Sequence, residues 1–337
     1  MKFKEVLIIT LACFLFAISS CKTNTEKTTE KSTTAKSGSP DFEISLAQWS
    51  LHKKYFGDIP ARGGYDWFIE TLENRPDEAI APGQDPLDFP KEAASFGINA
   101  IELVNTFYFG KVDDRPYWEK FKQNCEDAGV EVGLIMCDLL GDLGDADPVA
   151  QKIAVEKHYK WVDVAKFLGA HTVRVNAAGK GTAAEVAINA AAGLKELGEY
   201  GKRNGINIVV ENHGGHSSDG SWLAGVMKAV DMKNVGTLPD FGNFCIENGP
   251  NGCTKEYDRY KGIEELMPYA KAVSAKSLVF DKNGDEANID FYRIMKIVQA
   301  SGFKGHIGIE YEGNELSEED GIKKTILLLE KAFKSLD

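Results

Sequence analysis

Residues 206–215 read INIVVENHGG and describe a buried β-strand that ends in polar groups. Ile and Val dominate its first half without alternating with polar residues, as in strands of parallel sheets that are covered on both faces. Glu211, an amide, His213 and two glycines follow directly. The stretch therefore predicts a parallel strand that carries reactive side chains at its carboxyl end.

Two later strands repeat this pattern. Residues 235–238 lead through a proline to Asp240, and residues 306–309 lead into Glu310. The carboxyl ends of the strands of a parallel barrel meet at one face, which is where such barrels carry their active sites. We therefore expect Glu211, Asp240 and Glu310 to converge on a polar site that can hold a metal ion.

The whole second part of the chain alternates between β and α segments. Several expected helices end in a glycine, which suits the left-handed position after a helix, and a short apolar strand follows. The expected strands cover residues 44–49, 100–104, 132–136, 172–175, 208–210, 235–238, 272–276 and 306–309. Expected helices include residues 116–124, 148–168, 182–203, 289–300 and 318–336.

Eight such units in residues 41–337 predict one α/β domain, a (β/α)8 TIM barrel. The alternative is an open doubly wound sheet, but no GxGxxG follows the first strand, which argues against a dinucleotide-binding domain. Residues 52–86 are rich in Gly, Pro and aromatic residues, and we expect them to form a loop over the barrel mouth.

The first forty residues differ in composition from the rest. Residues 1–20 combine two lysines with an apolar run, too short to span a bilayer comfortably, and predict an export signal. Residues 18–21, ISSC, resemble the lipobox of bacterial lipoproteins, which implies cleavage before Cys21 and a lipid on that cysteine. An ordinary signal peptide and an uncleaved helix are the alternatives. Residues 22–40 lack large apolar residues, so we interpret residues 21–40 as the lipidated cysteine and a disordered tether.

Charge and cysteine content narrow the function further. The net charge of −12 disfavours nucleic acid as a partner, because phosphates would be repelled. The six cysteines show no spacing typical of structural zinc. Cys245 and Cys253 flank a Gly/Asn/Pro loop, and the sequence leaves open whether they form a disulfide.

Four segments in order resemble the xylose isomerase-like TIM-barrel superfamily, a group of sugar isomerases and epimerases. They are GINAIEL at 97–103, IVVENH at 208–213, PDFGN at 239–243 and GIEYE at 308–312. The resemblance covers about residues 43–335. It implies a divalent cation (Mn, Mg or Zn) held by Glu211, Asp240, Glu310 and a histidine on the seventh strand.

The fourth ligand position departs from this pattern. Ser274 stands where relatives carry the histidine, and the ammonium of Lys276, on the same face, would compete with a cation. His213 is in phase with Glu211 and offers a replacement imidazole; binding a sugar hydroxyl and a plain loop role are its alternatives. Lys276 itself could neutralise the acids, stabilise an enolate oxygen or lower a neighbouring pKa.

The resemblance also implies how the acids would act. Glu211 and Glu310 would flank a sugar carbon and exchange its proton, whereas a purely structural reading has such acids cap the following helices. Asn243 and Trp49 are candidates for substrate contact, although an aromatic residue at position 49 could equally belong to the core. Further candidates, for a structural ion pair or for binding substrate oxygens, are Arg174, Glu102 and Asn176.

These features together predict an exported, membrane-anchored lipoprotein that faces the periplasm or lies on the outer membrane. Its partners would be a small carbohydrate and, through lipidated Cys21, the membrane. The expected reaction is isomerisation or epimerisation by proton transfer next to a carbonyl, with metal assistance. One alternative is an eliminating lyase or hydrolase of 3-keto-glycosides, and another is a non-catalytic, lipid-anchored sugar-binding barrel.

Overall fold

The computed structural model describes residues 42–250 and 252–336. The predicted export signal, Cys21 and the tether lie outside the described residues. Within the described part, no helix combines the length and the apolar character needed to cross a membrane.

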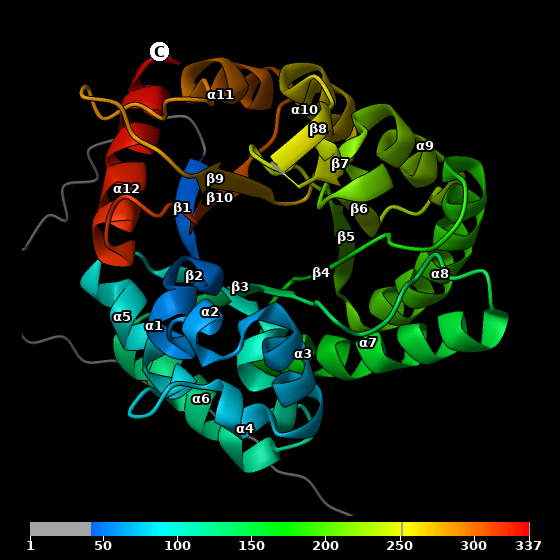
Figure 1. Ribbon diagram of the computed structural model, residues 1–337, viewed down its shortest axis with the longest axis horizontal. Helices are drawn as coiled ribbons and strands as arrows, with labels where there is room; N and C mark the ends of the chain where they lie inside the picture. The colour runs from blue at the N-terminus through cyan, green and yellow to red at the C-terminus, as the bar shows by residue number, and fades with distance from the viewer. Residues whose placement is uncertain (1–41, 251, 337) are drawn as a thin grey trace, which may run out of the picture. The chain divides into compact units, whose positions relative to one another are not determined.

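Eight parallel strands form the central ring of the barrel (Figure 1). Their order around the sheet is β6-β5-β4-β3-β2-β1-β10-β9. Bridges between Thr237 and Ala270 and between Asp240 and Ser274 join the two outer members and close the ring. The strands are β1 (Phe42–Ala47), β2 (Ala100–Val104), β3 (Glu131–Met136), β4 (Thr172–Val175), β5 (Asn207–Glu211), β6 (Val235–Leu238), β9 (Val273–Ser277) and β10 (Gly305–Tyr311).

Helices surround this ring on its outside (Figure 1). Their ends follow local chemistry: a capping box of Thr182 and Glu185 starts one helix, left-handed Gly205 ends the same helix, and left-handed Gly169 ends the helix before it. The helices are α5 (Phe89–Ser95), α6 (Arg115–Ala128), α7 (Pro148–Leu168), α8 (Ala183–Asn204), α9 (Gly220–Val230), α10 (Arg259–Leu266), α11 (Phe291–Ala300) and α12 (Glu318–Lys334). The predicted (β/α)8 architecture is thus confirmed.

The expectation of a loop at residues 52–86 is wrong, because most of this segment is helical. It forms α1 (His52–Phe56), α2 (Ile59–Arg62), α3 (Gly64–Asn74) and α4 (Pro76–Ala79). These helices are short and hold together through tertiary packing: the Phe56 ring lies 4.8 Å from that of Phe68 and 4.4 Å from that of Phe107. Such packing stabilises helices that lack a long periodic pattern of their own.

A hairpin follows β6 and lies outside the ring. Its strands are β7 (Cys245–Gly249) and β8 (Gly252–Glu256), which pair antiparallel. A disulfide joins Cys245 and Cys253 across the hairpin, which settles the pairing that the sequence left open. The two strands of the hairpin are therefore tied together covalently.

Candidate active site

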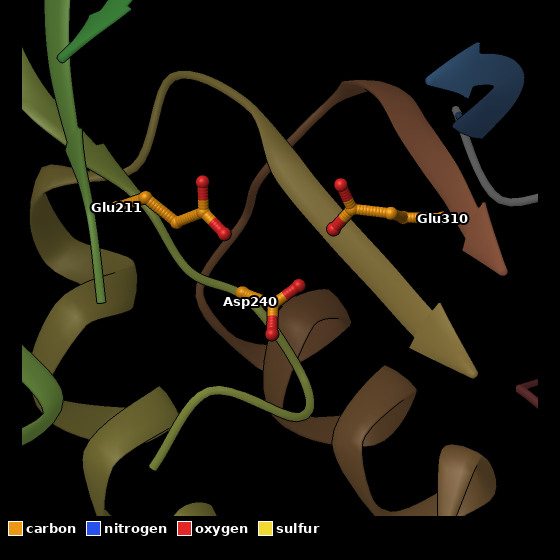
Figure 2. A group of neighbouring side chains, drawn as sticks. All are labelled: Glu211, Asp240 and Glu310. Carbon is orange, nitrogen blue, oxygen red and sulfur yellow. The ribbon is translucent and has the colours of Figure 1, made fainter. Parts of the chain in front are cut away.

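Three carboxylates meet at the carboxyl ends of the strands. Glu211 ends β5, Asp240 follows β6 by two residues, and Glu310 lies near the end of β10. Each side chain is buried and offers an oxygen within 4.8 Å of the other two. Figure 2 shows the three carboxylates pointing toward one another. β5 and β6 are neighbours in the sheet, and closure of the barrel between β6 and β9 brings β10, from a distant part of the sequence, to the same place.

Arg174 on β4 fixes the orientation of Glu211. Its Nε lies 2.6 Å from Oε2 of Glu211, and its Nη1 lies 2.7 Å from Oδ1 of Asp138. Asn176 donates a second hydrogen bond of 2.7 Å to the same Asp138 oxygen. Burial opposes the ionisation of Asp138, but the charges of Arg174 and His213 and the hydrogen bonds from Arg174 and Asn176 together outweigh it and lower the pKa of Asp138 to about 2. Ionised Asp138 thus holds Arg174, and Arg174 in turn holds Glu211 in place.

Asparagine side chains order the loop that carries Asp240. Asn212 accepts a hydrogen bond from the Asp240 backbone N–H at 2.8 Å and donates to the Asp240 carbonyl at 3.0 Å. Asn243 donates to Oε1 of Glu211 at 2.9 Å. Both oxygens of Glu211 therefore have a protein partner, and its carboxylate plane is fixed before any substrate binds.

Lys276 and Ser274 on β9 complete the site. The Nζ of Lys276 lies 3.4 Å from Glu310 and 3.2 Å from Glu312. The Ser274 hydroxyl donates to Asp240 at 2.6 Å and lies 3.4 Å from Glu310. Burial disfavours a charge on Lys276, but Glu310 and Glu312 outweigh it and raise the pKa of Lys276. The ammonium therefore stays charged inside the site.

The acids of the site repel one another in a buried place. Burial raises the pKa of Asp240 to about 6, although Lys276 opposes this shift. Burial, with further help from Glu312 and Glu211, also raises the pKa of Glu310 well above its usual range. The two fixed cations, Arg174 and Lys276, thus do not fully compensate the carboxylates.

The donor set fits a divalent cation. Glu211, Asp240 and Glu310 supply three oxygen atoms, the ligand type that Mg²⁺ and Mn²⁺ prefer. A cation here would share Glu211 with Arg174 and Glu310 with Lys276, and the Ser274 hydroxyl takes the place of an imidazole.

Of the three carboxylates, Glu310 lines a pocket of about 1110 Å³, whereas Glu211 and Asp240 are buried and are not among its lining residues. Glu310, Lys276, Arg174 and Asn176 lie on its wall, together with further predicted residues: Asn243, Trp49 and His213. The side chain of His213 is exposed, and its ring does not belong to the cluster of possible metal ligands formed by Glu211, Asp240 and Glu310. Trp49 stacks on His52 with ring centroids 5.0 Å apart.

Glu102 lies elsewhere. It is buried inside the barrel, where it accepts a 2.6 Å hydrogen bond from Ser45 and lines a separate cavity of about 110 Å³. The ion-pair partners of Arg174 are Asp138 and Glu211. Burial raises the pKa of Glu102 to about 7.

Among the acids of the pocket wall that the sequence analysis did not assign to the site, Asp138 and Glu312 pair with its basic residues Arg174 and Lys276. Asp138 follows β3 by two residues, as Asp240 follows β6, so the same signal was present. Glu312 comes two residues after Glu310, and residues two apart in a strand face the same side.

Solved structures of similar fold include several sugar epimerases. One is a D-tagatose 3-epimerase-like protein, which is 19% identical in sequence and superimposes with a TM-score of 0.59. The match covers 73% of this chain and 92% of the epimerase-like chain. A 3-keto-D-glucoside 4-epimerase from E. coli matches with 12% identity and a TM-score of 0.58. This match covers 74% of the present chain and 97% of the E. coli chain. A xylose isomerase-like TIM barrel protein from Mycobacterium smegmatis, in complex with magnesium, matches with 15% identity, 87% and 97% coverage and a TM-score of 0.61.

Comparison with curated proteins gave no match. The sequence of residues 90–332 matches the family described as xylose isomerase-like TIM barrel, and this match spans more than half of the chain. The closed ring of eight strands agrees with that assignment. The chain therefore belongs to the xylose isomerase-like TIM-barrel family.

Proposed function

We propose that this protein is a carbohydrate-converting enzyme of the isomerase or epimerase type, which moves a proton at a carbon next to a carbonyl. The convergence of Glu211, Asp240 and Glu310 carries this proposal. Proton transfer at such a carbon needs a base on one side, an acid on the other and positive charge near the carbonyl oxygen. The names of the structural neighbours, which are sugar epimerases, point to the same chemistry.

Glu211 and Glu310 would exchange the proton. Arg174 and Asn243 orient Glu211, which leaves its carboxylate little freedom to turn away from the substrate. Burial raises the pKa of Glu310, which makes its carboxylate a stronger base than an ordinary glutamate. Lys276 reaches the pocket wall and can donate a hydrogen bond to an enolate oxygen.

We propose Mg²⁺ or Mn²⁺ as the assisting cation, with Zn²⁺ less suited to a set of oxygen ligands without imidazole. Glu211, Asp240 and Glu310 would hold it. When bound, the cation would polarise the carbonyl next to the reacting carbon.

We also propose that the enzyme works outside the cytoplasm, attached to the membrane through a lipid on Cys21. The export signal and the lipobox-like residues 18–21 support this location.

Deuterium exchange tests the chemistry directly. The protein is incubated in D₂O with ketoses and 3-keto sugars, and NMR follows deuterium at the carbon next to the carbonyl. Glu211→Gln and Glu310→Gln should each lower exchange by a factor of about 10² or more, the size expected for an acid–base group. Glu286→Gln changes a buried carboxylate outside the site and serves as the control. Near-normal exchange in both site variants would refute the assigned roles.

Elimination from a 3-keto-glycoside is the second candidate. It starts with the same proton removal and then expels the glycosidic oxygen. The position of Lys276 favours it, since an ammonium between Glu310 and Glu312 on the pocket wall can protonate or bind the departing oxygen. Release of an alcohol from a 3-keto-glycoside in the same NMR experiment distinguishes this reaction. Sugar binding without exchange or release would instead indicate a binding protein.

A further inference from the structure

The pocket is larger than proton transfer on a single sugar requires. Its volume of about 1110 Å³ lies at the upper limit of small-molecule sites, which range from about 300 to 1,000 Å³. Of the three carboxylates, Glu310 alone lies on the pocket wall, so the site occupies one part of this volume. The rest of the pocket therefore has room for a further group of the substrate.

Residues other than those of the carboxylate site line the remaining volume, and we call this set of residues the outer zone. It consists of His216 in the turn after β5, Trp222 on α9, and Ile246, Glu247 and Lys255 of the β7–β8 hairpin, all of which line the pocket. Within the described part of the chain, none of these residues forms a hydrogen bond or ion pair with Glu211, Asp240 or Glu310.

Trp222 is held rigidly in the outer zone. Its indole N–H donates a 2.7 Å hydrogen bond to the carbonyl of Ala183, and the His216 ring lies 5.8 Å from its ring. The side chain is half-buried, so part of the indole remains open. A fixed, partly open aromatic surface is suited to the apolar C–H face of a sugar ring.

The hairpin gives the outer zone a firm edge. The Cys245–Cys253 disulfide ties its two strands, and Lys255 pairs with Glu247 at 3.1 Å. On the opposite side of the mouth lies Tyr65, whose side chain is 65% exposed and lines the same pocket. Tyr65 follows β1 and Trp222 follows β5, which stand four strands apart in either direction around the ring. Aromatic surfaces thus flank the mouth.

The charges of the pocket select against anionic substrates. Six acidic side chains line it: Asp138, Asp142, Asp219, Glu247, Glu310 and Glu312. The basic side chains there are Arg174, Lys255 and Lys276, and each of them is already paired with one of the carboxylates of the site or the rim. A phosphorylated or uronic sugar would meet uncompensated negative charge.

We propose that the substrate is a neutral glycoside of at least two units, with the reacting keto sugar at the carboxylates and the second unit on Trp222 in the outer zone. This inference rests on the proposed function for the identity of the reacting unit. It adds the size and charge of the substrate and names Trp222 as a residue that determines specificity.

Matched sugar pairs test the proposal by calorimetry and deuterium exchange. D-fructose is compared with lactulose, which carries an additional galactose, and methyl 3-keto-β-glucoside is compared with 3-ketocellobiose, in which the same keto unit carries a glucose in place of the methyl group. In at least one pair, the disaccharide should bind about tenfold more tightly than its single-unit partner, the gain expected from one well-placed aromatic contact. Equal affinities within both pairs would overturn the proposal.

Variants locate the second unit. Trp222→Leu should remove the gain for the disaccharide and leave the affinity for the single-unit partner unchanged. His216→Ala provides a second variant that does not touch the indole hydrogen bond to Ala183. Trp67→Leu is the matched control, since Trp67 is also half-buried but does not line the pocket. An unchanged gain in both outer-zone variants would contradict the assignment.

The readouts separate this inference from the proposed function. Selective, Trp222-dependent binding of a disaccharide without deuterium exchange would remove the proposed chemistry and leave the outer zone standing. Exchange with equal affinity for both members of each pair would do the reverse.

Discussion

At the scale of single residues, the site consists of three carboxylates that sequence analysis could find and a set of partners that it could find only in part. Glu211, Asp240 and Glu310 stand at the ends of apolar strands, so barrel geometry alone brings them within 4.8 Å. Which acid pairs with Arg174 depends on how far along the barrel axis each side chain lies, and the sequence does not give this position. Arg174 pairs in register with Met136, which places its side chain next to Asp138 and above Glu102.

Lys276 gives the first prediction at this scale. Lys276→Met removes the ammonium from beside Glu310 and Glu312, so the protein without metal should lose about 3 kcal/mol of stability, as when one partner of a buried pair is removed. A divalent cation should then bind more tightly than in the wild type, because no ammonium competes with it. Calorimetry with Mn²⁺ and thermal melts with and without the metal measure both effects.

Lys255→Met is the control for this experiment. It removes a lysine from the pocket rim, where its partner is Glu247 and not a carboxylate of the central group. Its affinity for Mn²⁺ should match that of the wild type. Weaker metal binding in Lys276→Met would show that the lysine supports the cation site and does not oppose it.

At the scale of elements, regular segments were predictable and irregular ones were not. The strands and the long helices α7 and α8 carry apolar periodicity and clear capping residues, and their bounds agree with the sequence to within a few residues. Helices α1 to α4 are short, and aromatic contacts such as Phe56–Phe68 stabilise them. The β7–β8 hairpin depends on a disulfide that no local pattern could decide. Both segments also contribute to the pocket wall, through Tyr65 and Phe68 of α3 and through Ile246, Glu247 and Lys255 of the hairpin.

Helix α7 carries a prediction about pH. His158 is buried, its Nδ1 lies 2.7 Å from the Ala154 carbonyl, and burial lowers its pKa from 6.5 to about 4. The unfolded chain takes up a proton below pH 6.5, whereas the folded protein does so only near pH 4. The contribution of neutral His158 is therefore fully present above pH 6.5 and is lost as the pH falls to about 4, by roughly 3 kcal/mol.

Replacing this histidine should flatten that dependence. In His158→Phe, the free energy of unfolding should fall less steeply between pH 6.5 and pH 4 than in the wild type, as measured by urea titration at several pH values. Parallel curves for His158→Phe and the wild type would mean that His158 does not contribute to acid sensitivity.

At the scale of the whole molecule, closure of the barrel explains why so much could be inferred from sequence. One rule, that parallel strands end at one face, assigns the acids of β5, β6 and β10 to a single site before any contact is known. The rule says nothing of the substrate, because the pocket wall also consists of loops, helix ends and the β7–β8 hairpin, whose side chains the strand pattern does not determine. Family membership is thus readable from the strands, while specificity has to be read from the rim.

The last prediction concerns attachment of the whole molecule to the membrane. Expressed in a bacterial host, the wild type should incorporate radiolabelled palmitate and partition into a detergent phase, because a lipidated Cys21 carries enough acyl chain for stable anchoring. Cys21→Ser should lose both the label and the detergent partitioning, and Cys125→Ser, which changes a buried free cysteine, should keep both. Released, unlabelled wild type would indicate an ordinary signal peptide, and membrane-bound but unlabelled wild type an uncleaved helix. Since the carboxylates lie within the described barrel, Cys21→Ser should retain full deuterium exchange in solution.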